Sequence, residues 1–376
     1  MRFHVAFLLI CHVSLAQMLE VPQRSGLSPT GSQLVSLLAP LSLAAREDRI
    51  FQEIMSGNVP AFLRTLVKVT YAQGGKSISV WTTPDYLSLG SDDDYFLIPM
   101  TPILAQRIAN ELDCSMPTKL LVDRIYSAAS LKLRPQPIPW SAEMVTIPVF
   151  SQHNDSVHAL RDPHLPTHPV GTLVGGHKKD VIISHKIYSE LKTNVPSPVV
   201  IYGWHQLNGI PIQPVYNGHV DWYADYSHGI RLVSDSMQVD GEWMLYRTLV
   251  ADGALYTLVA DAGPITKPYY ASPTGVGDDG GGQPEGFQLY QNYPNPFNPA
   301  TNIEWRMKQA GWVKVSVIDL RGREVAVLLD GEVSAGSHTA VWDASWAASG
   351  VYVYKLSLLG PHGIGTSLAR HMLLVR

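Results

Sequence analysis

Hydrophobic and polar residues alternate along the last ninety or so residues of the chain. Each alternating run places every second side chain on one face, which is the pattern of a strand with one buried face. The runs are Ile303/Trp305/Met307, Val313/Val315/Val317, Val325/Val327 and Val351/Val353. Seven or so such strands in about ninety residues predict a small β-sandwich.

The preceding 270 residues mix helical and strand patterns. Residues 33–55 have apolar residues at helical spacing, interrupted by Pro40, and predict one short and one longer helix. Helices are also expected at 102–112 and 118–133, as an αα-hairpin with a turn at 115–118. Apolar, β-prone runs predict strands at 66–71, 77–82, 86–89, 95–98, 145–150, 181–184, 199–202, 229–233 and 243–250. Residues 33–270 are therefore expected to form one α+β domain.

Two segments without regular pattern separate these parts. Residues 275–286 are rich in glycine and aspartate, so 271–286 reads as a flexible linker. The stretch Gln291 to Pro299 contains three prolines, which exclude a helix or a central strand and favour a stiff connector. The predicted β-module therefore occupies residues 287–376.

This module carries recognisable motifs. They are Phe287 to Thr301, Val313 to Asp319, Gly322 to Val325, Ala335 to His338, Val341 to Asp343, Gly350 to Tyr352 and His371 to Arg376. Together they resemble the type A C-terminal sorting domain of type IX secretion cargo, which is similar to the immunoglobulin-like domain of the flagellar hook-assembly protein. The resemblance implies an all-β immunoglobulin-like sandwich, recognition by the type IX secretion machinery, and a protein that is secreted or held on the outer cell surface.

The other end of the chain agrees with export. Residues 1–16 read as a signal peptide, with Arg2 as the positive residue, a short apolar run from Val5 to Ile10, and Ser14-Leu15-Ala16 before a cleavage site at Gln17. That apolar run is too short to span a bilayer, and no later stretch reads as a transmembrane helix. The expected route is through the periplasm.

Composition narrows the function classes. Charged residues make up only 16% and hydrophobic residues 45%, which indicates an ordered globular protein. The formal net charge of −4 gives no global attraction to nucleic acid. After removal of the signal peptide, Cys114 is the only cysteine, so no internal disulfide is possible. Its place at the end of an apolar helix favours a packing role over a nucleophile.

The candidate chemistry lies in a histidine-rich region. Nine of the fourteen histidines fall between His153 and His228, several beside glycine and close to an aspartate. An imidazole near a carboxylate is typical of general bases and metal ligands, although histidines also occur on ordinary polar surfaces. The predicted catalytic residues are His205, Asp225 and His228, with His177 and Asp180 assisting. Asp225 is expected to orient His228 or His205.

Substrate contacts are expected from residues next to these histidines. Trp204 and Trp222 are the best placed of the tryptophans for stacking on sugars, and Lys178 or Arg231 is expected to hold an anionic group. The spacing matches no known zinc-protease motif, so a divalent metal such as zinc is possible but not indicated. Residues 92–94, three aspartates, are interpreted as a solvated hairpin tip.

The sequence therefore predicts an exported hydrolase that acts on a cell-wall or other extracellular polymer. The alternative is a non-catalytic surface protein that binds glycan or protein. Histidines converging in a cleft would favour the enzyme, and scattered solvent-facing histidines would favour the binder.

Overall fold

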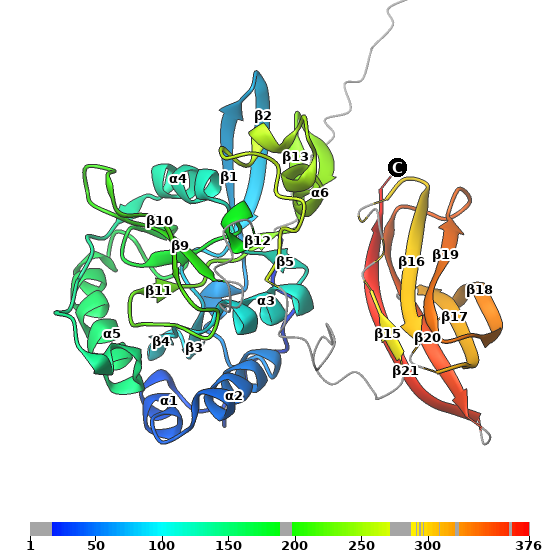
Figure 1. The fold of residues 1–376 in the computed structure, drawn as a ribbon, viewed down its shortest axis with the longest axis horizontal. Coiled ribbons are helices and arrows are strands. Elements are labelled where there is room, and N and C mark those ends of the chain that lie inside the picture. The colour runs from blue at the N-terminus through cyan, green and yellow to red at the C-terminus, as the bar shows by residue number, and fades with distance from the viewer. Residues whose placement is uncertain are drawn as a thin grey trace, which may run out of the picture.

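The computed structural model of the chain describes residues 17–188, 198–270, 287–290, 292, 295, 297–307, 309–319, 323–360 and 363–375. The predicted signal peptide and linker lie outside the described residues. Residues up to 270 combine helices with small sheets, and residues from 287 onward are rich in strands (Figure 1). The expected change from a mixed to an all-β composition is therefore present.

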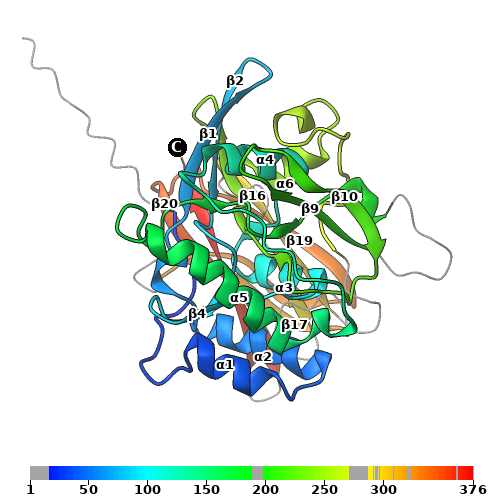
Figure 2. The ribbon, with the colours of Figure 1, turned by 90° about the vertical axis from the view of Figure 1, so that its left-hand side faces the viewer.

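Six α-helices lie among the described residues, and their N-termini show why they begin where they do. The side chains of Ser42, Thr101 and Thr118 accept hydrogen bonds from backbone N–H groups three residues later, which caps α2, α3 and α4. In both ribbon views α5 lies next to α1 (Figures 1 and 2). The helices are α1 (Gly31–Leu38), α2 (Leu43–Met55), α3 (Pro102–Glu111), α4 (Lys119–Ala128), α5 (Ile147–Arg161) and α6 (Tyr246–Ala251).

The largest sheet of residues 17–270 has the strand order β14-β13-β2-β12-β5, with β1 also paired to β2. The strands expected at 66–71 and 77–82 are present as β1 and β2, which pair in antiparallel register and turn at Gly74 and Gly75. The strands expected at 86–89 and 95–98 are present as the antiparallel pair β3 (Ser88–Gly90) and β4 (Tyr95–Leu97). The strands of the large sheet are β1 (Val67–Gln73), β2 (Lys76–Thr82), β5 (Cys114–Ser115), β12 (Val233–Ser234), β13 (Ser236–Val239) and β14 (Glu242–Leu245).

A second sheet has the order β10-β9-β8-β11 and holds most of the histidine-rich region. Its central strands are buried along their length, whereas β10 alternates between half-buried and exposed residues at the edge. Helix α4 packs against β9 (Figure 1). The strands are β8 (Lys179–Val181), β9 (Val199–His205), β10 (Pro211–His219) and β11 (His228–Gly229).

Several element predictions were wrong. The strands predicted at 181–184 and 229–233 are not continuous strands, because β8 ends at Val181 and residues 230–232 separate β11 from β12. Residues 145–150 form no strand, because Ile147, Phe150 and Val157 bury one face of α5 at helical spacing. Residues 243–250 change from β14 to helix α6 at Tyr246. The helix predicted at 118–133 ends at Ala128, and β6 (Leu131–Lys132) then pairs in parallel with β7 (Val174–Gly175).

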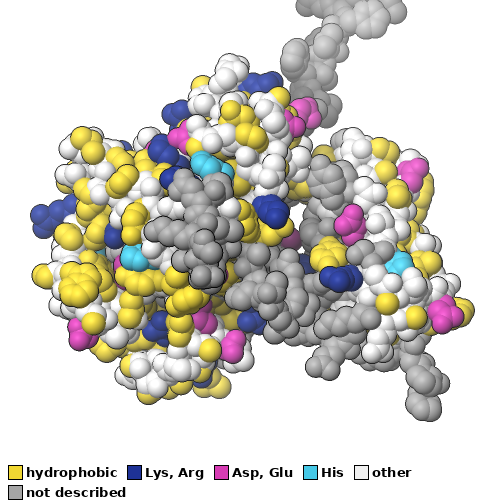
Figure 3. Space-filling view, viewed as in Figure 1, with side chains coloured by type: hydrophobic (Ala, Val, Ile, Leu, Met, Phe, Trp, Pro, Cys, Tyr) yellow, Lys and Arg dark blue, Asp and Glu magenta, His cyan; other side chains and the backbone are white. Residues whose placement is uncertain are grey.

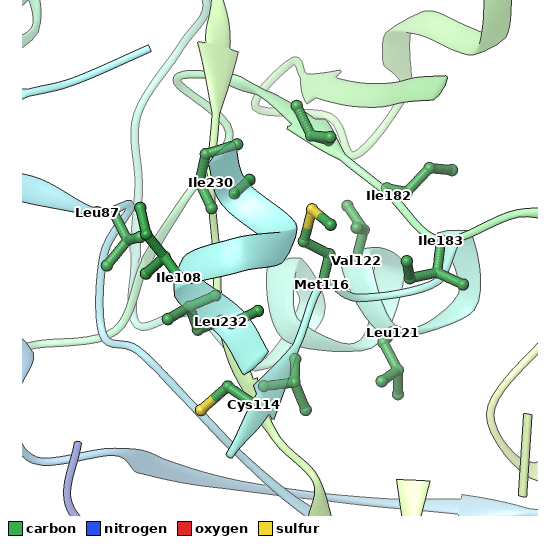
Figure 4. Packing of buried hydrophobic residues seen from close by; sticks show 14 of the residues in the cluster. Leu87, Ile108, Cys114, Met116, Leu121, Val122, Ile182, Ile183, Ile230 and Leu232 are labelled. Atoms are coloured by element: carbon green, nitrogen blue, oxygen red, sulfur yellow. The ribbon is translucent and has the colours of Figure 1, made fainter. Parts of the chain in front are cut away.

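The main hydrophobic core gathers helices and both sheets of residues 17–270. Figure 4 shows Ile108, Leu121 and Val122 of two helices packed with strand and loop residues such as Ile182 and Leu232. Cys114 belongs to this core and is 2% exposed. Burial raises the pKa of its thiol well above the usual range, so the thiol stays protonated and packs as a small apolar group, as predicted.

The strands from residue 287 onward form two antiparallel sheets, in the orders β15-β16-β19 and β18-β17-β20-β21. Side chains of both sheets, including Trp305, Val315 and Tyr354, share one hydrophobic core. Figure 1 shows the strands that carry them. Among the described residues, that core contains none before Phe287, and the main core contains none after Tyr270. The strands are β15 (Phe287–Leu289), β16 (Ala300–Met307), β17 (Gly311–Asp319), β18 (Glu324–Val333), β19 (Gly336–Asp343), β20 (Gly350–Gly360) and β21 (Gly363–Leu374).

The surface carries both signs of charge. On the face drawn in Figure 3, basic and acidic side chains are scattered among apolar ones rather than collected in one large patch. Within the described ranges, no helix has both the length and the apolar character needed to cross a lipid bilayer.

Close packing at β11 provides a stability test. A Cβ at Gly229 would lie 2.6 Å from Tyr86 Cδ1 and 2.7 Å from Lys178 Cβ, closer than real contacts allow. Gly229→Ala is therefore expected to destabilise the fold by about 1–3 kcal/mol, measured as a lower melting temperature. The control is Gly253→Ala, where a Cβ meets nothing within 4 Å. Equal melting temperatures for the two variants would contradict this packing.

Candidate functional site

Three buried histidines around the β10-β9-β8-β11 sheet each have a carboxylate neighbour. His177 pairs with Asp85 at 3.0 Å and His205 pairs with Asp123 at 3.1 Å. His228 lies 3.9 Å from Asp225, the residue predicted to orient it. All three rings are at most 3% exposed, so they are not surface histidines.

Strand register separates these groups onto two faces of the sheet. Lys179 of β8 is paired with His228 of β11, and the next residue, Asp180, is paired with Tyr202 of β9. Paired residues project to the same face and successive residues to opposite faces. His228 and Lys179 therefore share one face, and Asp180 and Tyr202 share the other. Asp225 lies with His228. His205 lies with Tyr202 on the second face, because both contact Asp123 and because the positive φ angles of Gly203 and Trp204 interrupt the alternation of β9.

Asp123 holds the His205 ring in one orientation through a hydrogen bond. Asp123 Oδ1 accepts hydrogen bonds from Tyr202 Oη at 2.8 Å and from His205 Nε2. Burial alone would raise the pKa of Asp123, but these bonds and one from Lys119 hold it below its usual value. Because the ionised carboxylate only accepts, His205 Nε2 carries the proton in this bond, and Nδ1 is the ring nitrogen that does not contact Asp123. The ring also stacks on Tyr126, with 4.4 Å between the ring centres.

This pair lines an open pocket of about 520 Å³. Asp123, Tyr126 and Lys132 come from α4 and the segment after it, and the loop between β9 and β10 closes the other side. A volume of this size is within the range of small-ligand sites. The remaining lining residues are Ser127, Tyr202, His205, Leu207, Asn208, Gly209 and Pro211.

The backbone before His205 is strained. Gly203 has φ of +103° and Trp204, which is not glycine, has φ of +55°. A bulky residue in the left-handed region is costly and is found most often at functional sites. A Cβ at Gly203 would lie 3.4 Å from both His205 Nδ1 and Asp180 Oδ2. The turn therefore places His205 Nδ1 and the carboxyl group of Asp180 around one small space.

Asp180 lies behind His205 in the protein interior. Tyr86 Oη donates a hydrogen bond to its Oδ2 at 2.9 Å, and Arg231 Nε is 3.9 Å from its Oδ1. Burial raises the pKa of Asp180 to about 6, although Arg231 and the Tyr86 bond oppose the shift. A cavity of about 10 Å³, lined by Asp180, His205, Tyr86 and Arg231 among others, connects these side chains. Asp180 can therefore exchange a proton near neutral pH.

His177 supports the same side of the network. Its Nε2 donates to Asp85, whose pKa is held below its usual value because His177 and Arg231 outweigh the effect of burial. Its ring packs edge-on against Tyr86. Burial lowers the pKa of His177 itself, so the ring is neutral. The Tyr86 side chain therefore links His177 to Asp180, since it packs against the first and donates a hydrogen bond to the second.

The other face holds a second polar cluster. Neither ring nitrogen of His228 has a hydrogen-bond partner among the described residues, and burial lowers its pKa to about 4. Asp225 instead accepts hydrogen bonds from Ser227 and Tyr223. Burial would raise its pKa, but His228, Lys179 and the bonds from Ser227 lower it to about 2. Close by, Lys178 Nζ donates to Tyr226 O at 2.6 Å and lies 3.2 Å from His153 Nδ1.

The predicted substrate-binding residues differ in exposure. Lys178, Arg231 and Trp204 are all at most 5% exposed. The Arg231 guanidinium donates to Thr83 O and Val174 O, and Trp204 Nε1 donates to His177 O, so these groups hold the interior together. Only Trp222, 55% exposed, is open to a ligand.

The described residues contain no group of three or more His, Cys, Asp or Glu side chains arranged to hold a metal ion. Asp92 and Asp94 of the predicted hairpin tip accept hydrogen bonds from Phe62 N and Ser32 N. Their oxygens tie chain segments together.

Two partners were missed by the sequence reasoning. Asp123 is 82 residues from His205, and Asp85 is 92 residues from His177. No local motif joins such distant positions. The one available signal for Asp123 was a carboxylate in the predicted helix at 118–133, four residues after Lys119, with which it forms an ion pair.

The burial of His228 predicts acid lability. Its folded pKa of about 4 is below the ordinary value of about 6.5, so the unfolded chain binds more protons between these values. The contribution of His228 to the free energy of unfolding is fully present above pH 6.5 and is lost as the pH falls toward 4. At pH 5 the loss is about 2 kcal/mol.

We therefore expect His228→Gln to reduce the drop in melting temperature between pH 7 and pH 5 by about 4–8 °C. His153 and His177, whose pKa values burial also lowers, account for the drop that remains. His164→Gln, at an exposed position, is the matched control and should leave the drop unchanged. An identical drop in His228→Gln and wild type would show that His228 is already protonated in the fold.

Comparison with known proteins concerns the C-terminal part. Residues 291–359 match the family described as the secretion system C-terminal sorting domain. The crystal structure of dimeric latent PorU from Porphyromonas gingivalis matches with 21% identity and a TM-score of 0.22, over 25% of this chain and 10% of that chain. This chain thus covers about a tenth of the length of that protein. No curated protein matches the chain.

The sorting-domain match confirms the resemblance seen in the sequence motifs. The chain carries a type IX secretion C-terminal sorting domain, interacts through it with the secretion machinery, and is exported to the cell surface or secreted.

Proposed function

We propose that this exported chain is a hydrolase that acts on a cell-wall or other extracellular polymer at the pocket formed around His205 and Asp123. The observation that supports this most is the His205–Asp123 pair in the wall of a 520 Å³ pocket, directly after the strained residues Gly203 and Trp204. An oriented imidazole with a free basic nitrogen is what general-base catalysis requires.

The residues have separate roles in this proposal. His205 Nδ1 takes a proton from water as the water oxygen bonds to the electrophilic carbon of the substrate. Asp123 fixes the ring and stabilises the imidazolium that forms. The His205 imidazolium then gives this proton to the leaving group in the open pocket, while Asp180 assists from its buried position behind the ring. His177 and Asp85 hold Tyr86 beside Asp180, whereas His228 and Asp225 stabilise the opposite face of the sheet.

We also propose the domain limits and the fold of the export module. An effector domain at 33–270, a linker at 271–286 and a sorting domain at 287–376 are supported by two separate hydrophobic cores. The two antiparallel sheets formed by β15 to β21 support an immunoglobulin-like sandwich. A signal peptide at 1–16 would deliver the chain to the periplasm.

A non-catalytic binder is the second candidate. Large apolar side chains on and around the β9–β10 hairpin are exposed, and such a strip is typical of recognition surfaces. They are Leu207, Ile210, Ile212, Tyr216 and Trp222.

Product analysis distinguishes the two candidates. The exported protein is incubated with a panel of peptidoglycan and extracellular polysaccharides in water enriched in oxygen-18, and the products are analysed by mass spectrometry. The hydrolase proposal predicts soluble fragments that carry one labelled oxygen at each new end. Tight binding to a polymer without fragments would favour the binder, and unlabelled fragments would indicate a cleavage that does not use water.

A further inference from the structure

A second pocket of about 480 Å³ adjoins the pocket at His205. Leu207 and Asn208, in the loop between β9 and β10, line both of them. The two adjoining pockets are together called the groove, and they offer a longer surface than one small molecule needs. The second pocket is also lined by Arg134, Pro135, Pro137, Gln206 and Ile212.

Two cations lie along one side of this groove. Lys132 lines the first pocket and Arg134 the second. Leu131 and Leu133, which alternate with them, are buried at 5% and 3% exposure. Residues two apart in an extended segment project to the same side, about 7 Å apart. The alternation therefore points both positive side chains outward along the groove.

Neither cation is neutralised by the protein. Lys132 Nζ lies over the ring of Tyr126 at 5.1 Å, and in the described part of the chain neither Lys132 nor Arg134 forms an ion pair. Asp123 is the only carboxylate that lines the groove among the described residues, and it already binds Lys119 and His205. The groove is thus locally positive, although the chain has a net charge of −4.

The groove edge is not suited to an extended peptide. Strand β10 is the outer strand of its sheet, and Pro211 and Pro214 remove two backbone donors from it. An added peptide strand depends on such donors. Leu207 and Ile212 instead offer exposed apolar surface, at 62% and 42% exposure, against which the C–H faces of sugar rings can pack.

From the row of Lys132 and Arg134 beside the His205 pocket, we infer that the groove binds an acidic polysaccharide whose carboxylates contact these two side chains. This inference rests on the proposed function for what happens at His205, but the binding itself does not require turnover.

Binding is measured by titration calorimetry with the full chain carrying His205→Gln, so that no polymer is consumed. The probes are polygalacturonate, alginate and hyaluronate, together with polygalacturonate whose carboxylates are methyl-esterified. Charge removal at one position, Lys132→Gln or Arg134→Gln, is expected to weaken binding about fivefold, and the double variant more strongly. The effect should shrink at high salt because salt screens exposed charges.

The charge-matched control is Lys76→Gln. Lys76 pairs with Asp240 at the β1–β2 hairpin and lines neither pocket. Its loss should leave the affinity for the acidic polymers unchanged.

Several results would overturn the inference. They are failure to bind any of the three acidic polymers, equal binding of the methyl ester, an unaffected double variant, and polyglutamate binding as tightly as the polysaccharides. The hydrolase proposal and the acidic-polysaccharide inference are refuted by different results. Charge-dependent binding without cleavage by wild type would refute only the hydrolase, whereas cleavage unaffected by Lys132 and Arg134 would refute only the acidic-polysaccharide inference.

Discussion

Deleting residues 287–376 is expected to abolish release of the protein and leave it inside the outer membrane. The deleted part contains the whole sorting-domain match at 291–359, and its strands form a core of their own. Residues 17–270 retain their main hydrophobic core, so the truncated chain should still fold. The measurement is the amount of protein in periplasm, outer surface and medium, by immunoblot after cell fractionation.

A reporter fusion provides the control for that deletion. Residues 287–376 placed after a signal peptide and an unrelated periplasmic reporter should carry the reporter to the surface or the medium. Normal amounts of the truncated protein in the medium would contradict a sorting role for this module.

Replacing His205 by glutamine is expected to lower kcat/KM by about 10²-fold or more, the usual contribution of a general base. The amide of glutamine can still donate to Asp123 Oδ1, but it has no basic nitrogen to accept a proton from water. The variant should therefore melt within a few degrees of wild type. The measurement combines steady-state kinetics on a polymer cleaved by wild type with thermal melting.

Asp123→Asn is the companion change. It removes the charge that stabilises the imidazolium while keeping the size of the side chain, so activity should fall less than in His205→Gln. Full activity in the His205 variant would exclude the base role, whatever the effect at Asp123.

The sequence predicted those elements whose local signals agree with each other. The turn and cap at residues 115–118 and the alternation in the last ninety residues each had one interpretation. The strand predictions for residues 145–150 and 243–250 were wrong because a short apolar run fits a strand or a buried helix turn equally well. In both segments, contacts with the rest of the core stabilise a helix.

The site was predictable only in part. Glycines and aspartates near His177, His205 and His228 drew attention to these histidines, and the structure buries all three beside a carboxylate. Sequence neighbours could not show that Asp225 and His205 lie on opposite faces, because this depends on the register between β8, β9 and β11 and on the turn at Gly203 and Trp204. Only the fold brings Asp123 to His205.

The most direct test of this account compares two matched histidines. His205→Gln and His228→Gln both remove a buried ring beside an aspartate, one at the open pocket and one on the opposite face. The measurement is kcat/KM for the two variants on one polymer substrate, in parallel with wild type. The account predicts a loss of about 10²-fold or more in His205→Gln and nearly wild-type turnover in His228→Gln. Loss of turnover in His228→Gln with normal turnover in His205→Gln would contradict it.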